Sequence, residues 1–299
     1  MAFKSGFITI IGRPNVGKST LLNLLTGEKV AIMSNKPQTT RTSIRTVLTT
    51  DDYQMVFVDT PGMHTPKNKL GQFMMKEVYN SIEDVDVIIY MVEATDKKIG
   101  KGDSRIIEEL RKAGAPVILV INKIDLVEKE SLLPLIAQYA QAYEFEEIIP
   151  VSALNADTKN QVLDVLFKLL PEGELYYPED MLTDQQSKVL AQELIREKLL
   201  QLLSEEVPHG IGIEIISFKE DNDNNVIYID ADIYCEKKSH KGIVIGKNGT
   251  MLKRVGTLAR QDMENLFDAK VVLKLWVKVK DDWRNNDFVL NELGYKDKD

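Results

Sequence analysis

Cysteine is almost absent from this sequence: Cys235 is the only one among 299 residues. No disulfide can form within the chain, and a lone thiol fits a reducing compartment. No run of eighteen apolar residues occurs, which excludes a transmembrane helix of ordinary length. The first six residues lack the charged segment, apolar stretch and cleavage site of a signal peptide, so the sequence predicts a cytoplasmic protein.

The sequence also has fewer basic than acidic residues. Lys and Arg number 38 against 46 Asp and Glu, which gives a formal net charge of −8. Bulk charge therefore does not favour binding to polyanions, and any nucleic-acid site must be local. Hydrophobic residues make up 43% of the chain, and a chain of this length is expected to form two domains.

The clearest motif is GRPNVGKS at residues 12–19, between the apolar run 7–11 and the leucine-rich run 21–25. In a strand–loop–helix context, a GxxxxGK[ST] loop points backbone N–H groups at phosphates. Its Lys reaches the β- and γ-phosphates, and its Ser hydroxyl suits Mg²⁺. The sequence therefore predicts a nucleoside triphosphate site formed by Gly12, Arg13, Pro14, Asn15, Val16, Gly17, Lys18, Ser19 and Thr20.

Three further motifs each follow an apolar run: DTPG at 59–62, NKID at 122–125 and SAL at 152–154. In open α/β sheets, ligands bind just beyond the carboxyl ends of the strands. The Asp125 carboxylate can accept from both the ring N–H and the exocyclic amine of guanine, which adenine cannot match, so the nucleotide is GTP or GDP. The nucleotide contacts expected from these motifs are Asp59, Thr60, Pro61, Gly62, Asn122, Lys123, Asp125, Ser152, Ala153 and Leu154.

The order of apolar runs and helical patterns predicts the domain organisation. Alternation from residue 7 to about 170 predicts a doubly wound α/β domain with a mainly parallel sheet. One exception is the pair 43–50 and 54–58, whose short connection predicts a hairpin with an antiparallel edge strand. Residues 171–180 contain two prolines and four acids and read as a linker. We expect a GTP-binding domain at 1–172, a linker at 173–183 and a second domain with a C-terminal tail at 184–299.

The second domain has a different pattern. Thr183 and Gln186 form a capping box for a helix ending near residue 203, and strands are predicted at 211–219 and 226–235. A helix at 250–267 and a strand at 270–278 complete the order α-β-β-α-α-β, with one further short helix before residue 246. This is the order of a type II KH domain, a small α+β module that binds RNA.

Residues 246–249 read GKNG, which matches the GXXG loop that clamps single-stranded RNA in KH domains. Taken alone, the tetrapeptide is better explained as a glycine turn. However, residues 237–261 contain seven Lys or Arg and no acid, which makes a local phosphate-binding face. The apolar residues 243–245 are expected to fill the core rather than to contact bases. The predicted RNA contacts are Lys238, Lys241, Gly246, Lys247, Asn248, Gly249, Lys253 and Arg254.

Together with PQTTR at 37–41, these motifs span almost the full length, and the chain resembles the Era family of bacterial GTPases. The resemblance implies GTP hydrolysis, binding of the KH domain to the 3′ region of 16S rRNA, and assistance in maturation of the 30S ribosomal subunit. It also implies peripheral contact with the inner face of the cell membrane. A switch threonine, Thr40 with Thr39 as the alternative, is expected to join Ser19 and Asp59 around Mg²⁺. We expect a monomer.

The predicted catalytic residues are Asn15, Lys18, Thr40 and Gly62. The next residue is Met63, which cannot orient the attacking water as the Gln of Ras-like enzymes does, so we expect slow unaided hydrolysis. In related GTPases an Asn at the position of Asn15 helps to hold K⁺, although this residue could instead only shape the turn. A loop histidine such as His64 is expected to be solvated.

Two other functions are compatible with parts of this pattern. The first is a metabolic phosphotransferase, which NKID and the absence of a second substrate signature disfavour. The second is an RNA-binding protein with an inactive G domain, which Met63 favours. Product analysis and hydrolysis assays with K⁺ would separate these functions from a GTPase switch.

Overall fold

The structure is a computed structural model that describes residues 2–28, 31–34, 36, 38–204 and 207–296. Contacts divide the chain into two compact units. The first comprises Met1–Ala31, Thr40–Thr65 and Met74–Asp184, and the second comprises Ile32–Thr39, Pro66–Phe73 and Gln185–Asp299. No helix in the described ranges is both long and apolar enough to cross a bilayer.

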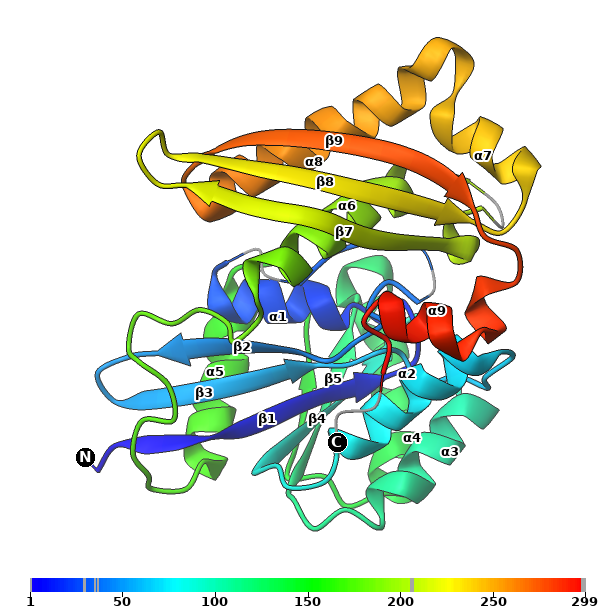
Figure 1. Ribbon diagram of the computed structural model, residues 1–299. Helices are drawn as coiled ribbons and strands as arrows, with labels where there is room; N and C mark the ends of the chain where they lie inside the picture. Colours follow the sequence, from blue (N-terminus) through cyan, green and yellow to red (C-terminus); the bar gives the residue numbers. More distant parts are fainter. Residues whose placement is uncertain (1, 29–30, 35, 37, 205–206, 297–299) are drawn as a thin grey trace. The chain divides into compact units, whose positions relative to one another are not determined.

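The first unit contains a six-stranded sheet in the order β2-β3-β1-β4-β5-β6 (Figure 1). All neighbouring strands are parallel except β2 and β3, which pair antiparallel as the short connection predicted. The strands are β1 (Lys4–Gly12), β2 (Ile44–Thr49), β3 (Tyr53–Asp59), β4 (Val87–Glu93), β5 (Val117–Asn122) and β6 (Glu147–Pro150).

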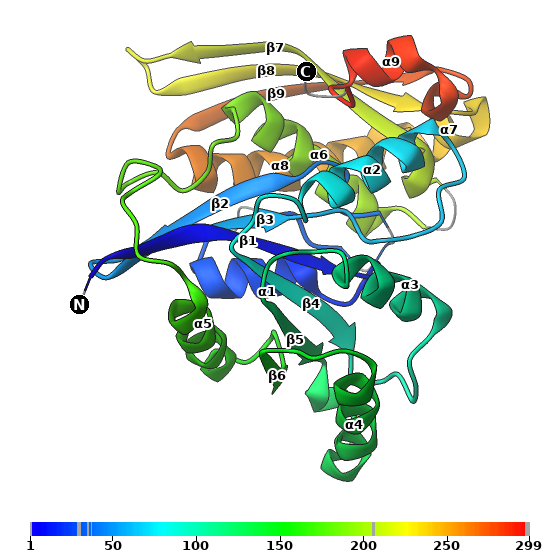
Figure 2. The same cartoon turned by 90° about the horizontal axis from the view of Figure 1, so that it is seen from below.

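Helices cover both faces of this sheet (Figure 2). One apolar cluster joins the sheet to α1 (Lys18–Thr26) and α5 (Asp157–Leu169). A second cluster joins the other face to α2 (Lys69–Asn80), α3 (Lys101–Leu110) and α4 (Leu132–Ala142). Strands buried on both faces need apolar side chains at nearly every position, which is why they read as continuous apolar runs. The predicted doubly wound α/β domain is confirmed.

The segment expected to be a linker lies along the end of this sheet. The Gln54 side chain accepts from the N–H groups of Tyr176 and Tyr177 at 2.8 and 3.0 Å and donates to the Tyr177 carbonyl at 2.9 Å. The Val47 N–H donates to the carbonyl of Leu182 at 2.8 Å. By these contacts the segment belongs to the first unit, whose last residue is Asp184.

The predicted capping box at Thr183 is wrong. The Thr183 hydroxyl donates to the carbonyl of Arg45 in β2 at 2.6 Å. Helix α6 begins at Ser187 with Gln186 as its N-terminal flanking residue. The helix therefore starts four residues after Thr183, which is too late for Thr183 to be its N-cap.

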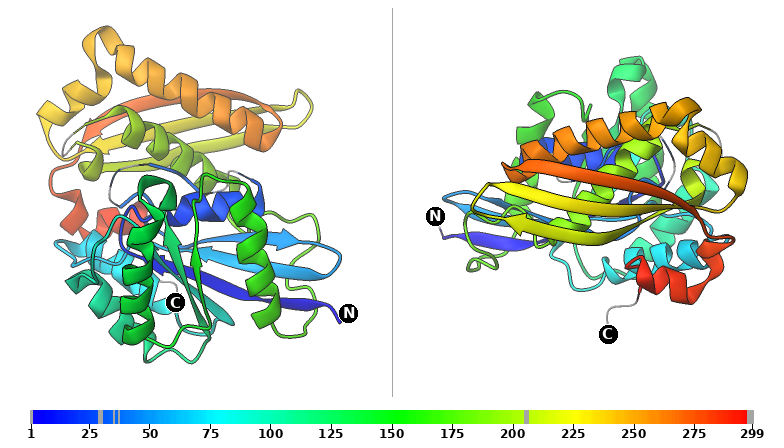
Figure 3. Two further views of the ribbon diagram at one scale, coloured as in Figure 1. Left: turned by 180° about the vertical axis from the view of Figure 1, so that it is seen from behind. Right: turned by 45° about the horizontal axis from the view of Figure 1, so that its top comes forward.

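The second unit has the predicted order α-β-β-α-α-β (Figure 3). Strand β8 pairs antiparallel with β7 and parallel with β9, while α6 and α8 share one apolar cluster with the sheet. Within the predicted core segment, Val244 is fully buried, whereas Ile243 is 49% exposed. The elements are α6 (Ser187–Leu202), β7 (Ile211–Asp221), β8 (Val226–Cys235), α7 (Lys238–Ile245), α8 (Thr250–Phe267) and β9 (Lys270–Val279), followed by α9 (Asp287–Glu292), which the sequence did not predict.

Candidate nucleotide and RNA sites

The four nucleotide motifs of the first unit meet at one edge of the sheet. Register places Ile10 beside Asp59, Glu93 beside Asn122 and Ile121 beside Pro150. Because β1, β3, β5 and β6 are parallel, the segments that follow them emerge on the same side. The phosphate loop, DTPG, NKID and SAL are therefore neighbours, as expected for a ligand site at strand carboxyl ends.

The phosphate loop surrounds the side chain of Lys18. Gly17 lies in the left-handed region at φ 103° and turns the chain into α1, whose first residue is Lys18. The Lys18 ammonium group lies 3.5 Å from the carbonyl oxygen of Gly12 and 3.3 Å from that of Arg13. Burial lowers the pKa of Lys18 to about 8, although the Asp59 carboxylate opposes this shift. A triphosphate in the loop would supply the negative charge that favours the ammonium form.

Three oxygen-bearing side chains converge next to this lysine. The Ser19 hydroxyl donates to Asp59 Oδ2 at 2.8 Å, the Thr40 hydroxyl donates to the same atom at 3.0 Å, and the two hydroxyls lie 3.2 Å apart. Burial raises the pKa of Asp59, while Lys18 and the two hydroxyls oppose the rise. Asp59 Oδ1 is buried and has no hydrogen-bond partner in the part of the chain that the structure describes.

This donor set fits Mg²⁺. The ion prefers oxygen ligands and is commonly held by one carboxylate together with substrate phosphates, rather than by a cage of side chains. Consistent with this, no group of three His, Cys, Asp or Glu that could hold a metal occurs among the described residues. Thr39, the alternative switch residue, donates instead to the carbonyl of Lys36 at 2.7 Å. Pro37 of the PQTTR motif lies outside the described residues.

The DTPG segment is packed tightly against the phosphate loop. The Thr60 hydroxyl donates to the Ile10 carbonyl at 2.7 Å, and the Met63 N–H donates to the Gly12 carbonyl at 2.9 Å. A Cβ at Gly62 would lie 2.6 Å from the backbone nitrogen of Pro14, which is too close for any side chain, so this position requires glycine. Met63 is buried in the apolar cluster beneath α2 and α3 and presents no polar group to a water molecule.

His64 is half-buried rather than solvated, contrary to expectation. Its ring nitrogen Nδ1 lies 2.8 Å from the carbonyl oxygen of Gly62, and its backbone N–H points at the sulfur of Met75 at 3.3 Å. The residue therefore stabilises its own loop.

Asn122 connects the base side of the site to the phosphate loop. Its side chain donates to the Val16 carbonyl at 2.9 Å and accepts from the Ala153 N–H at 2.9 Å. Lys123 lies in the left-handed region at φ 66°, and its ammonium group pairs with Glu93 and donates to the Asn15 carbonyl at 2.9 Å. Asp125 and Leu154 are exposed at the same end of the sheet, where the base would lie.

Arg13 is turned away from the phosphate position. Its guanidinium group donates to the buried Asp103 at 3.0 Å and pairs with Asp96. Asp103 also accepts from the Tyr90 hydroxyl at 2.9 Å. The sequence did not reveal Asp96, Asp103, Tyr90 or Glu93 as part of the site, because these residues follow no motif and lie about 80 to 90 positions from the loop they support. Arg13 anchors the loop.

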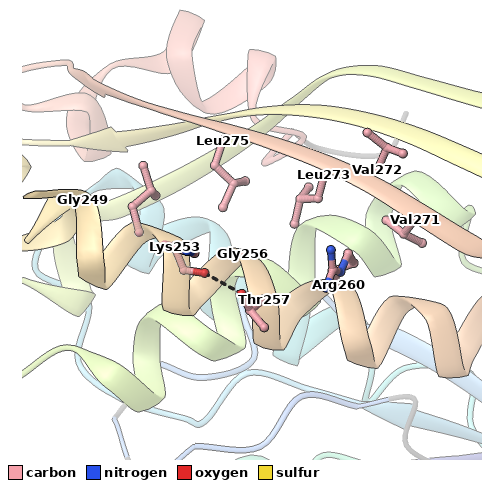
Figure 4. A pocket seen from close by; sticks show the side chains of 10 residues that line it. Gly249, Lys253, Gly256, Thr257, Arg260, Val271, Val272, Leu273 and Leu275 are labelled. Carbon is pink, nitrogen blue, oxygen red and sulfur yellow. Dashed lines mark hydrogen bonds between the residues drawn. The ribbon is translucent and has the colours of Figure 1, made fainter.

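The second unit contains the predicted GXXG loop between α7 and α8. Gly246, Asn248 and Gly249 adopt positive φ values of 73°, 53° and 76°. Asn248 and Gly249 are in the left-handed helical conformation, whereas Gly246 has ψ 172°. Lys247 and Asn248 are exposed. The loop opens into a groove between α8 and β9, with Gly249 at one end (Figure 4).

Basic residues line one wall of this groove and apolar residues line the other. Lys253 and Arg260 project from α8, whereas Val271, Leu273 and Leu275 come from β9 (Figure 4). Of the predicted RNA contacts, Gly249 and Lys253 line the groove. Lys238 and Lys241 lie on α7, and Arg254 is exposed on α8 without lining the groove. Gly256, Thr257 and Arg260 were not predicted as contacts, although Arg260 belongs to the basic stretch that signalled the site.

Comparison with known proteins identifies the family. Residues 7–123 match the family model described as 50S ribosome-binding GTPase, and residues 206–284 match the KH domain. GTPase Era of Clostridium kluyveri is 54% identical over 293 residues, which cover 98% of this chain and 99% of that protein. GTPase Era of Clostridium perfringens is 52% identical over 294 residues, with the same coverage. The chain belongs to the Era family of GTPases.

Solved Era structures share the fold. A crystal structure of Era in complex with MgGDPNP and nucleotides 1506–1542 of 16S ribosomal RNA matches with a TM-score of 0.94 and 40% identity, over 98% of this chain and 99% of the other. An Aquifex aeolicus Era variant bound to GDP and AlF₄⁻ gives the same TM-score, identity and coverage. The predicted GTPase activity and the predicted pairing of a P-loop domain with a KH domain are thus confirmed.

Proposed function

We propose that this Era-family GTPase is a switch that binds the 3′ region of small-subunit rRNA through its KH domain and assists maturation of the 30S subunit. The observation that supports this proposal is that one chain contains both the nucleotide-binding motifs, gathered around Lys18 and Asp59, and a basic groove that begins at the GXXG loop. A relative of 40% identity has been solved with MgGDPNP and a 16S rRNA fragment, which supports both ligands.

Hydrolysis transfers the γ-phosphoryl group to water, forming inorganic phosphate as the bond to the β-phosphate oxygen breaks. In our proposal Lys18 and the loop N–H groups hold the β- and γ-phosphates, and the Gly62 N–H contacts the γ-phosphate. Ser19, Thr40 and Asp59 would hold Mg²⁺, and the ion would supply neutralising charge to the phosphate oxygens. Asp125 selects guanine, while Asn122 and Lys123 fix the loop against the base site.

We further propose that Asn15 helps to hold a K⁺ ion, because Met63 is buried and cannot orient water. Asn15 lies at φ 68°, and its carbonyl is fixed by Lys123. Replacement of Asn15 by Ala should leave GTP affinity within about twofold of wild type and remove any rate advantage of KCl over NaCl. Lys18→Ala serves as the binding-defective comparison. Equal wild-type rates in both salts would contradict the K⁺ site, and loop geometry would then be the role of Asn15.

The remaining proposals come from the family resemblance. We propose a monomeric cytoplasmic protein with peripheral contact with the inner face of the membrane. Sedimentation of the purified protein tests the first point. Fractionation of cell membranes before and after a high-salt wash tests the second.

The decisive experiment is crosslinking in cells followed by sequencing of the bound RNA. Reads concentrated at the 3′ end of 16S rRNA would support the proposed function, and a protein without rRNA reads would contradict it. A multiple-turnover assay of the same preparation should yield only GDP and inorganic phosphate, since a phosphotransferase would instead modify a second substrate.

A further inference from the structure

The second-unit sheet has an unusual outer face, the side turned away from α6 and α8. Along β9, Val271 and Val277 are buried toward the helices, whereas Val272 and Trp276 on the other side are 40% and 47% exposed. Tyr228, which pairs with Val272 across the β8–β9 ladder, is 45% exposed. An exposed cluster of large apolar side chains on a folded domain commonly marks a binding surface.

Lysines alternate with these apolar side chains. Lys274 lies between Val272 and Trp276 on the exposed side of β9, and Lys278 follows at the same spacing. Side chains on one face of a strand repeat every 6 to 7 Å or so. On β7, Lys219 pairs with Tyr228. Aromatic rings interleaved with lysines are the features by which single-stranded nucleic acid is bound without strict sequence preference.

Asp230 lies on this face as well, half-buried and opposite Lys274 in the β8–β9 ladder. Two other acidic residues of the face are engaged with neighbours. Asp232 pairs with Lys278, and Glu214 accepts from the Tyr234 hydroxyl at 2.6 Å. These residues lie toward the end of the sheet at Gly212, where a Cβ would meet Leu293 at 2.8 Å and Trp283 at 3.3 Å. The C-terminal segment therefore covers that end, and the part from Tyr228 to Trp276 is open.

The open part is continuous with the GXXG groove. A second hollow at the start of β9 is lined by Tyr228, Lys270 and Glu264, and it shares Arg260, Val271 and Val272 with the groove. Figure 4 shows Arg260 on α8 and Val271 and Val272 on β9 at the end of the groove away from Gly249. A chain that leaves the groove there passes Arg260 and reaches the Tyr228 ring.

The length of the RNA in a related complex leaves nucleotides available beyond the groove. A GXXG loop clamps about four nucleotides. The RNA in the Era complex of 40% identity runs from nucleotide 1506 to 1542, which is 37 nucleotides when both ends are counted. Most of an RNA of that length must lie outside a four-nucleotide groove.

We propose that RNA leaving the groove at the start of β9 continues onto the outer face as a single strand, stacking one base on Tyr228 and another on Trp276. Lys274 contacts the phosphate between them. This inference rests on the proposed RNA-binding function, and it adds a second RNA subsite that continues from the GXXG groove and uses other residues. Stacking of a base on an aromatic side chain contributes about 1–3 kcal/mol, so each ring should be measurable alone.

The test compares two RNAs on the full-length protein. The long RNA corresponds to nucleotides 1506–1542 of 16S rRNA, and the core RNA is its shortest truncation whose binding still depends on Gly249. Tyr228→Ala should weaken the long RNA about tenfold and the core RNA less than twofold. Tyr228→Phe should restore tight binding of the long RNA, since it keeps the ring. Phe288→Ala, which removes a 70% exposed ring on α9, is the matched control and should change neither affinity.

Fluorescence gives an independent reading. The long RNA should quench tryptophan emission in the wild type but not in Trp276→Phe, because the remaining tryptophan, Trp283, is fully buried. The core RNA should not quench the emission of either protein. Wild-type affinity of Tyr228→Ala and Trp276→Ala for the long RNA would overturn the proposal. If those variants then bound ribosomal subunits poorly, the face would contact a protein instead. Failure of wild-type protein to bind even the core RNA would contradict the proposed function, not this subsite alone.

Discussion

The ammonium group of Lys123 lies 2.9 Å from the carbonyl oxygen of Asn15, so the guanine-recognition motif directly supports the phosphate loop. Asn122 makes a second link of the same kind through the Val16 carbonyl. Loss of either side chain would leave a loop carbonyl without this donor. In this GTPase, binding of the base and binding of the phosphates are therefore not structurally independent.

Replacing Asp125 with Asn should change the base preference. In the proposed site the carboxylate would accept two hydrogen bonds from guanine, and an amide would present its own N–H to one of those donors. We expect GTP affinity to fall by roughly 3 kcal/mol, over a hundredfold, while xanthosine triphosphate gains affinity through its C2 oxygen. Equilibrium titration with labelled nucleotides measures both. Asp157→Asn, at the first turn of α5, removes the same charge outside the motif and should alter neither.

Asp103 should matter more than Asp96, although both contact Arg13. Asp103 is 1% exposed and accepts hydrogen bonds from Arg13 and Tyr90. Asp103→Ala would therefore leave two buried donors without this acceptor. We expect a loss of about 2–4 kcal/mol in the free energy of unfolding, with weaker GTP binding. Asp96→Ala removes a pair whose side chains are 26–31% exposed and should cost less than about 1 kcal/mol.

Urea unfolding and nucleotide titration of both variants check this ranking. Equal losses, or a stable Asp103→Ala protein with wild-type GTP affinity, would show that Arg13 does not anchor the loop.

The sequence predicted most of the fold because its signals are local. A strand was expected at 54–58 and β3 lies at Tyr53–Asp59, since a strand buried on both faces must be apolar at nearly every position. The capping box failed because α6 begins at Ser187, which is too late for Thr183 to be its N-cap. Helix α9 was missed because six residues carry too little periodicity to stand out.

The nucleotide motifs of the site were also predictable from local sequence. Its motifs are contiguous stretches whose spacing encodes phosphate, metal and base contacts. The residues that hold those motifs in place were not predictable, since Asp103 reaches Arg13 only after β4 and α3 have packed. The sequence also did not predict the groove beyond Gly249, because its apolar wall belongs to β9, whose sequence is that of an ordinary strand.

Cys235 should be unreactive in the folded protein. Burial raises the pKa of its thiol to about 11, with Lys241 opposing the shift, so little thiolate exists near neutral pH. A thiol reagent at pH 8 should label Cys235 slowly in the native protein and rapidly after denaturation. In unfolded chains the thiol titrates near 8.5. The folded state therefore holds its proton more tightly, and stability should fall as pH rises from about 9 to 11. Rapid native labelling would show that the thiol is accessible.

Gly249→Asp should separate RNA binding from GTP hydrolysis. No heavy atom lies within 4 Å of a Cβ placed at Gly249, so the new side chain has room and projects a negative charge from the GXXG loop, although the positive φ strains it. The left-handed backbone at φ 76° is a conformation that Asp tolerates better than most residues. We expect RNA affinity to fall tenfold or more, about 1.4 kcal/mol upward, with RNA-free GTP hydrolysis near the wild-type rate. Filter binding to a single-stranded rRNA fragment and a phosphate-release assay measure the two effects.

The matched control for that variant is Gly114→Asp, in the first unit. It adds the same side chain at a glycine that also has open space around it and needs no left-handed backbone. If both variants lowered RNA affinity equally, the cause would be overall charge rather than the loop. If Gly249→Asp folded normally and bound RNA as tightly as the wild type, the GXXG loop would not be the clamp. The basic residues of α8, with Arg260 at the far end of the groove, would then have to hold the RNA without it.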